Sequence, residues 1–189
     1  MDEQSKRDQF LKIISMLESS GGQNMNHAEI QSGIHQGHRA SGQYGLMPNT
    51  VQEMATRMKR DDQLPENLSG VFDMDPDDIK RFIEESPDAE QAIASYMADR
   101  ALSRQGDPEK AAYSWLYGHN LRPEQIAERG YQDDPYVQKY RKYRDDMFAE
   151  VEQPKRNSVT KSVDEPPKQN DQKYLDQLFP GLRKTLRYD

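Results

Sequence analysis

Apolar residues recur at helical spacing through the first 150 residues of the chain, between clear signals for helix ends. The earliest stripe consists of Phe10, Ile14 and Leu17, and Gly21 and Gly22 follow it as a helix stop. Because positions three and four residues apart share one face of a helix, this stripe predicts an amphipathic first helix that packs on a core.

Later helix starts are predicted by capping side chains that stand directly before a proline. The capping side chain accepts free backbone amides, and proline suits the first helical position. The pairs are Asp75-Pro76, Ser86-Pro87, Asp107-Pro108 and Asp134-Pro135. Thr50 and Glu53 form a capping-box pattern, which predicts one more start. Since no stretch alternates like a strand, we predict an all-α domain of short helices over residues 1–150.

The last of these helices carries a stripe of tyrosines. Tyr136, Tyr140 and Tyr143 recur at helical spacing after Asp134-Pro135. Aromatic side chains in such a stripe bury a large area, so we interpret them as core residues or as a protein interface.

The chain changes character after about residue 150. Residues 151–189 are mostly polar and are interrupted by Pro154, Pro166 and Pro167, a composition that does not offset the entropy of ordering a chain. The end of this segment carries apolar residues again: Tyr174, Leu175, Leu178, Phe179, Leu182 and Leu186. We therefore predict an extended tail over 151–189 whose terminal apolar segment docks on a partner, with folding back onto the parent domain as the alternative.

Composition and charge exclude several classes of function. The chain is 33% hydrophobic and 31% charged, and its formal net charge is -7, which argues against binding nucleic acid through bulk charge. It has no cysteine, so thiol catalysis and cysteine zinc sites are excluded. Its apolar runs fall far short of the roughly 20 residues that a membrane span needs. The polar, acidic start is not typical of a secretory signal.

The histidines do not form a recognisable metal site. His27, His35 and His38 match no zinc-ligand spacing, and His119 is remote from them in the sequence. We expect them to be solvated or to order their loop, and we expect neither a metal nor another cofactor.

Glu18 is the candidate for acid–base chemistry. It stands in the last turn of the first predicted helix, next to an apolar stripe and before Gly21 and Gly22. The negative end of the helix dipole and partial burial both disfavour a charged carboxylate and raise its pKa, as a general acid near neutral pH requires. The alternative is an ordinary solvated glutamate before a glycine cap.

Three segments place Glu18 in a wider pattern. They are Glu18-Ser19, then Gly45-Leu46-Met47 followed by Pro48-Asn49-Thr50, and then Ala112-Tyr113 with Gly118. This order resembles the lytic transglycosylase (lysozyme-like) superfamily over roughly residues 7–120. The resemblance implies a lysozyme-like helical fold with Glu18 as the catalytic acid.

The resemblance also implies a set of substrate-binding residues. The family usually has a glutamine after Gly-Leu-Met, whereas here Pro48 follows directly, and we expect Gln43 to supply a similar amide from upstream. Tyr44 and Tyr113 are expected to stack on a sugar or to orient Glu18, with core or rim positions as the alternative. The full set is Ser19, Gln43, Tyr44, Tyr113 and His27.

The mechanism that the resemblance implies needs one carboxyl group. Glu18 would protonate the glycosidic oxygen between N-acetylmuramic acid and N-acetylglucosamine, then accept the proton of the muramoyl 6-hydroxyl as a 1,6-anhydro ring closes. A hydrolase would need a second carboxylate. Glu29 is the acidic residue in the loop after Glu18, and its neighbours do not mark it as tuned. The lyase is favoured, and a muramidase-type hydrolase stays open.

A wall substrate without an export signal indicates delivery by a carrier. We expect a component of a bacteriophage virion that binds peptidoglycan glycan strands and acts in the host periplasm or cell wall. Residues 151–189 would attach it to virion proteins of the tail or portal region. The alternative is a catalytically inactive structural or adaptor protein of a virion or secretion apparatus with the same fold. Nucleic acid is not an expected partner.

Overall fold

The computed structural model describes residues 2–25, 27 and 39–152, which fall within one compact unit, Met1–Glu152. This part of the chain is helical, with an isolated bridge but no strand, and the predicted all-α class is confirmed. The α-helices are α1 (Glu3–Ser19), α2 (Pro48–Arg60), α3 (Pro76–Glu85), α4 (Pro87–Gln105), α5 (Pro108–Tyr117), α6 (Pro123–Glu128) and α7 (Pro135–Glu152). The 3-10 helices are η1 (Glu66–Asp73) and η2 (Tyr131–Asp133). The predicted docking tail lies outside the described residues, apart from the end of α7.

Helix starts follow the predicted capping pairs closely. Asp75, Asp107 and Asp134 each accept backbone N–H groups from the first turn of α3, α5 and α7. The prediction at Thr50 is wrong, because α2 begins two residues earlier, at Pro48. Proline fits the first helical position, so Thr50 falls inside the first turn.

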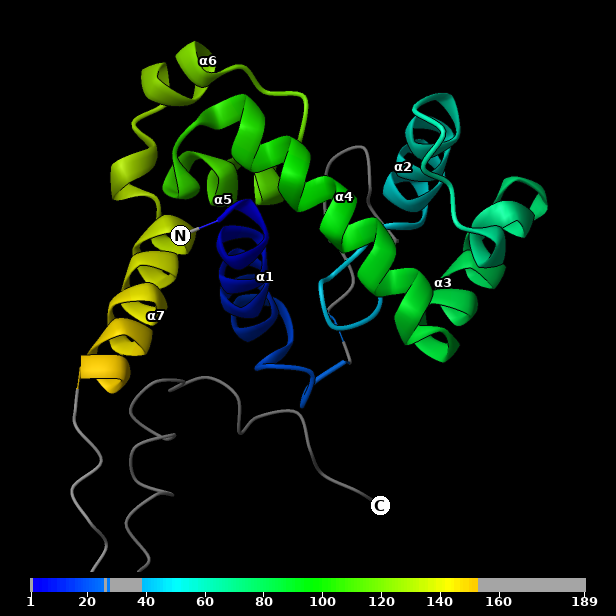
Figure 1. The fold of residues 1–189 in the computed structure, drawn as a ribbon, viewed down its shortest axis with the longest axis horizontal. Helices are drawn as coiled ribbons and strands as arrows, with labels where there is room; N and C mark the ends of the chain where they lie inside the picture. Colours follow the sequence, from blue (N-terminus) through cyan, green and yellow to red (C-terminus); the bar gives the residue numbers. More distant parts are fainter. Residues whose placement is uncertain (1, 26, 28–38, 153–189) are drawn as a thin grey trace, which may run out of the picture. The chain divides into compact units, whose positions relative to one another are not determined.

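α4 is the central helix of the unit. It packs against α1, α2, α3 and α5, and it crosses the middle of the molecule in Figure 1. Its buried residues, which spread over about half of its circumference, are Ala89, Glu90, Ile93, Ala94, Tyr96, Met97, Ala98, Ala101 and Gln105. A helix buried over so wide a face is typical of the centre of a core.

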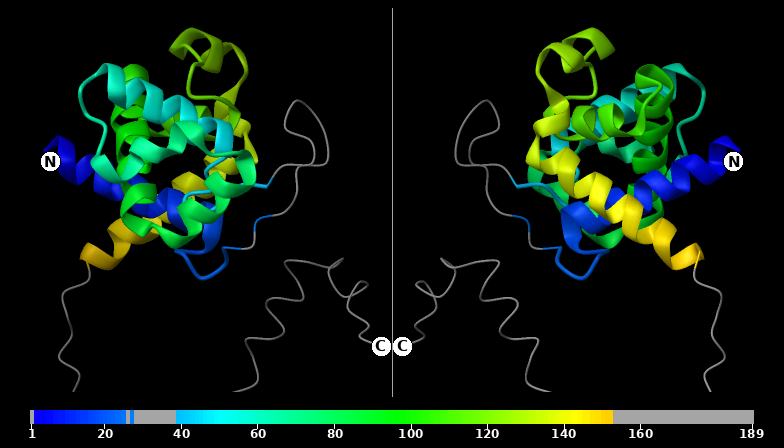
Figure 2. Two further views of the ribbon diagram at one scale, coloured as in Figure 1. Left: turned by 90° about the vertical axis from the view of Figure 1, so that its right-hand side faces the viewer. Right: turned by 90° about the vertical axis from the view of Figure 1, so that its left-hand side faces the viewer.

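α7 is fixed against both α1 and α5. The ring of Phe10 in α1 lies 6.0 Å from that of Trp115 in α5 and 5.7 Å from that of Tyr140 in α7. Two arginines of α7, Arg141 and Arg144, bind Glu109 of α5 at 2.6 and 2.8 Å. α1 and α7 cross in both views of Figure 2. This packing places the start of α7 beside the end of α1.

No helix in the described ranges combines the length and the apolar character that crossing a membrane requires.

Candidate active site

The carboxyl group of Glu18 is held at the C-terminal end of α1 by a hydroxyl from α7. The Tyr136 hydroxyl donates a hydrogen bond of 2.6 Å to Glu18 Oε1. Burial raises the pKa of Glu18, against the lowering effects of the Tyr136 hydrogen bond and of nearby His27. The pKa is therefore shifted in the direction that its sequence position predicts, with burial as the main cause.

A turn that contains two glycines packs beside the other oxygen of this carboxyl group. Ser41 and Leu46 exchange two backbone hydrogen bonds of 2.9 Å and close a turn over residues 42–45, here called the glycine turn. A Cβ on Gly45 would lie 2.7 Å from Glu18 Oε2, and Gly45 has a φ of +64°. Both the close approach and the left-handed backbone require glycine at this position. Glu18 thus faces the segment that the sequence analysis paired with it.

Ser19 joins the end of α1 to the glycine turn. Its side chain is 1% exposed, and its hydroxyl lies 2.8 Å from the carbonyl oxygen of Gln43 and 3.0 Å from that of Ser15. The same oxygen accepts the N–H of Gly22 at 2.8 Å. Ser19 was expected to bind substrate; its burial and these three backbone partners give it a structural place instead.

Gln43, Tyr44 and His27 also gather around the glycine turn. The side chain of Gln43 lies next to Gly22, 3.5 Å from a Cβ built there. The Tyr44 hydroxyl donates to Gln91 Oε1 at 2.6 Å, and His27 Nε2 lies 2.6 Å from the carbonyl oxygen of Gly42. Of these residues, His27 is close enough to Glu18 to lower its pKa, whereas the Tyr44 side chain is directed to α4. Their expected role in binding substrate stays a prediction.

Tyr113 does not join them. It is 7% exposed and packs in a separate apolar cluster with Ile126, Tyr131 and Val137. Its ring centroid lies 4.5 Å from that of Tyr117. The tyrosine that contacts the Glu18 carboxyl is Tyr136, which sequence reasoning assigned to the core or an interface.

Tyr136 is built to remain a hydrogen-bond donor. Burial, together with the adjacent Glu18 carboxyl group, raises the pKa of Tyr136 well above its ordinary value. Asp134 accepts the backbone N–H of Tyr136 at 2.9 Å as part of the α7 cap, which fixes where the side chain starts. The sequence placed Tyr136 in the first turn of a helix, two residues after the capping Asp134. Nothing in the sequence indicated that its hydroxyl contacts Glu18.

A second buried carboxyl group, which sequence reasoning missed, lies against the glycine turn. Glu90 in the first turn of α4 is 4% exposed and accepts the backbone N–H of Tyr44 at 2.8 Å and that of Gln43. Burial raises the pKa of Glu90, against the lowering effect of these hydrogen bonds. A Cβ on Gly42 would overlap Glu90 Oε1. In the sequence, the position of Glu90 between the apolar residues Ala89 and Ile93 could have indicated that its side chain is buried.

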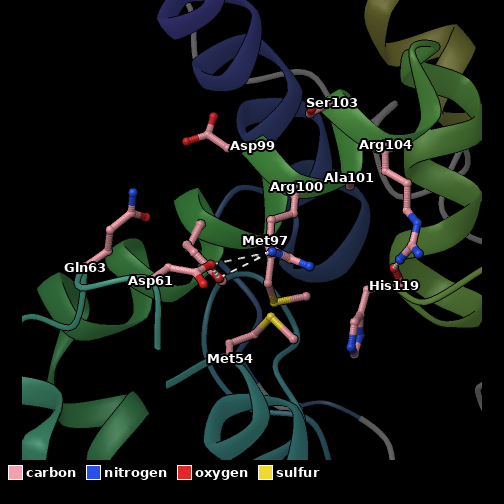
Figure 3. A pocket seen from close by; sticks show the side chains of 11 residues that line it. Met54, Asp61, Gln63, Met97, Asp99, Arg100, Ala101, Ser103, Arg104 and His119 are labelled. Atoms are coloured by element: carbon pink, nitrogen blue, oxygen red, sulfur yellow. Dashed lines mark hydrogen bonds and ion pairs between the residues drawn. The ribbon is translucent and has the colours of Figure 1, made fainter. Parts of the chain in front are cut away.

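A cavity of about 520 Å³ opens between α2, α4 and the segment after α5. Figure 3 shows Met54 and Met97 side by side, with Arg100 directed toward Asp61. Asp61 accepts the Tyr96 hydroxyl at 2.6 Å and lies 3.7 Å from Arg100, so these lining charges are already engaged. The residues that line this cavity include neither Glu18 nor any residue of the glycine turn.

Glu29, His35 and His38 lie outside the described residues. No protein-family model, curated protein or solved structure matches this chain. Because Tyr136 donates to Oε1, the proton of a neutral Glu18 resides on Oε2, and a carboxyl group with a raised pKa can deliver that proton near neutral pH.

Proposed function

We propose that this protein is a peptidoglycan lytic transglycosylase with a lysozyme-like fold, in which Glu18 is the general acid and then the general base. The observation that carries the proposal is the Glu18 carboxyl group, half-buried with a raised pKa between the Tyr136 hydroxyl and Gly45. The all-helical domain and the approach of Glu18 to the Gly45-Leu46-Met47 segment support it.

In the first step, Glu18 protonates the glycosidic oxygen between N-acetylmuramic acid and N-acetylglucosamine. The bond from C1 to that oxygen breaks, and its electron pair leaves with the N-acetylglucosamine hydroxyl. The carboxylate that forms stabilises the positive charge that develops on the muramoyl ring. The Tyr136 hydroxyl keeps the carboxyl group oriented throughout this step.

In the second step, the same carboxylate takes the proton of the muramoyl 6-hydroxyl. The oxygen of that hydroxyl bonds to C1 and closes a 1,6-anhydro ring. Glu18 ends in the neutral form in which it began, and no water is consumed. One carboxyl group therefore suffices for the whole cycle.

The surroundings of Glu90 favour the lyase over a hydrolase. A hydrolase needs a second carboxylate that reaches the sugar or the attacking water. Glu90 lies at the same turn, but it is buried against Gly42 and its carboxylate accepts backbone amides. It is thus not exposed to a substrate beside Glu18.

The proposal includes delivery by a bacteriophage virion, with residues 151–189 as the attachment to virion proteins. The alternative of a catalytically inactive structural protein predicts the same attachment without lysis. Removing residues 153–189, which begin after α7, should leave lysis of isolated walls intact and abolish incorporation into particles. Unfolding of the shortened protein would contradict the docking role.

Lysis of purified cell walls tests the activity. We expect the wild-type protein to clear the walls and the Glu18→Gln variant to clear them about 10²–10⁴-fold more slowly, the usual contribution of a general acid. Glu85→Gln is the matched control, because Glu85 also ends a helix but is exposed. Clearing by folded Glu18→Gln at the wild-type rate would refute the enzyme and leave the structural alternative.

A further inference from the structure

Glu90 is a buried carboxyl group that the proposed reaction does not use. Its hydrogen bonds come from the backbone amides of Gln43 and Tyr44, and His27 is a nearby group that also lowers its pKa. Burying a carboxyl group is costly unless hydrogen bonds satisfy its oxygens. The position of these bonds indicates what Glu90 does.

The glycine turn lies between two carboxyl groups. Gly42 at one end of the turn contacts the carboxylate of Glu90, and Gly45 at the other end contacts that of Glu18. Both glycines have positive φ values, +76° and +64°. The backbone is thus shaped to approach a carboxyl group closely at each end, and a shift of the turn away from Glu90 also changes the surroundings of Glu18.

We propose that Glu90 is a positioning residue for Glu18: from α4 it holds the amides of the glycine turn, and so keeps the backbone of Gly45 packed against one side of the Glu18 carboxyl group. This inference rests on the proposed function for its catalytic meaning. The mechanical link between Glu90, the turn and Glu18 is independent of which reaction Glu18 performs.

A simpler role for Glu90 would be to stabilise the N-terminus of α4 with its negative charge. The contacts favour the positioning role. The backbone N–H groups of Ala89 and Glu90, in the first turn of α4, already donate to the Ser86 carbonyl oxygen at 3.0 Å. The carboxylate of Glu90 instead accepts the backbone N–H of Tyr44, which lies 46 residues earlier in the chain and outside α4.

The charged and titratable groups around the turn define what a pH titration reports. Glu18 faces Tyr136 from α7 and His27 from the segment after α1, and Glu90 faces His27 and the turn. Tyr136 stays protonated in the range where the carboxyl groups titrate, because its pKa is raised well above its ordinary value. Glu18 and Glu90 are therefore the carboxyl groups to follow.

The test on the wild-type protein is an NMR titration of the full chain with labelled glutamate side-chain carboxyl carbons. The amide signals of Gln43 and Tyr44 should move with the titration of the Glu90 carboxyl group, and the Glu18 carboxyl signal should show a step at the same pH. Amide signals that do not follow Glu90, or a Glu18 signal without that step, would overturn the proposal.

The variant Glu90→Gln adds a kinetic readout. A glutamine places an N–H group against an amide that needs an acceptor, so we expect the turn to loosen, water to reach Glu18, and the Glu18 pKa to fall toward its ordinary value. Because Glu18 must be protonated to act, the alkaline limb of the pH–rate profile should move to lower pH with it, and kcat should fall by about tenfold to a hundredfold with KM little changed. The control Asp88→Asn removes a charge from the same helix end at an exposed position and should change neither.

The outcomes separate the two proposals. A lowered Glu18 pKa in folded Glu90→Gln supports the positioning role even where walls are not cleaved, a result that defeats only the proposed function. An unchanged Glu18 pKa and pH profile in Glu90→Gln, or equal shifts in Asp88→Asn, would overturn the positioning role. If Glu90→Gln fails to fold, the wild-type titration decides.

Discussion

Glu18 and Glu109 lie on helices in partly buried surroundings, yet their carboxyl groups are held in opposite ways. Glu18 accepts one hydrogen bond from the neutral Tyr136 hydroxyl, and burial raises its pKa. Glu109 binds the guanidinium groups of Arg141 and Arg144, and their hydrogen bonds lower its pKa despite burial. The charge of the partner decides whether a buried glutamate can act as an acid near neutral pH.

Glu90 and Glu53 repeat this contrast. Glu90 accepts neutral backbone amides such as that of Tyr44, and burial raises its pKa. At Glu53 burial acts in the same direction, but hydrogen bonds from Arg57 and His119 bring the pKa down to about 2. The carboxyl groups beside the glycine turn thus have raised pKa values. Those of Glu109, which joins α5 to α7, and of Glu53 on α2 have lowered pKa values.

The strongest way to break the contrast is to fill the space beside Glu18. In Gly45→Ala, the added Cβ would press on Glu18 Oε2, so we expect lysis to fall by about a hundredfold or more, as for a displaced catalytic group. Wall clearing by the purified variant measures this. Gly130→Ala is the matched control, because its φ of +66° carries the same backbone strain while nothing lies within 4 Å of the added Cβ. Equal losses in both variants would show that strain alone is responsible.

Removing the neutral donor is the next test. Tyr136→Phe deletes the hydrogen bond that lowers the Glu18 pKa, so this pKa should rise further and the alkaline limb of the pH–rate profile should move to higher pH. We expect kcat to fall about tenfold, the value of one hydrogen bond to a charged group. Tyr143→Phe is the control, because Tyr143 lies about two turns further along α7. It should leave the pH–rate profile unchanged. A profile that stays unchanged in Tyr136→Phe would contradict the role given to its hydroxyl.

The sequence predicted the local features of this fold better than its long-range contacts. The caps at Asp107 and Asp134 were predicted because a capping side chain and the following proline are neighbours in the chain. The contact of Tyr136 with Glu18 spans 118 residues and depends on how α7 packs against α1. Its periodic pattern marked Tyr136 as a buried tyrosine, and such a pattern does not specify which carboxyl group the hydroxyl meets.

The contrast is sharpened by removing a charge-paired carboxylate. Glu109→Gln leaves two α7 arginines without their carboxylate, and we expect the free energy of unfolding to fall by about 1–2 kcal/mol, because these groups are partly solvated. Chemical denaturation measures it, and lysis by the folded variant should be unchanged. Glu84→Gln is the control, since its exposed pair with Lys80 spans 4.0 Å and contributes little. A Glu109→Gln protein that keeps its stability but loses lysis would contradict the structural role given to Glu109.

The smallest effect concerns acid stability. The folded-state pKa of Glu53 is about 2, below its ordinary 4.5, so the folded protein binds fewer protons than the unfolded chain between these values. Its contribution is therefore present above about pH 4.5 and is lost as the pH falls toward 2. Because Glu53 is 40% exposed, we expect less than about 1 kcal/mol. Denaturation at several pH values across this range gives the free energy of unfolding as a function of pH, and this dependence should be flatter for Glu53→Gln than for the wild type. The same pH dependence in both proteins would contradict the lowered pKa of Glu53.

The most direct test of the central claim is to digest purified cell walls in ¹⁸O-labelled water and weigh the fragments by mass spectrometry. If Glu18 closes the muramoyl ring without water, the wild-type protein releases fragments with 1,6-anhydro ends that carry no ¹⁸O, and folded Glu18→Gln releases them at most at a trace rate. New reducing ends labelled with ¹⁸O, or release of the same fragments by Glu18→Gln at the wild-type rate, would contradict the account.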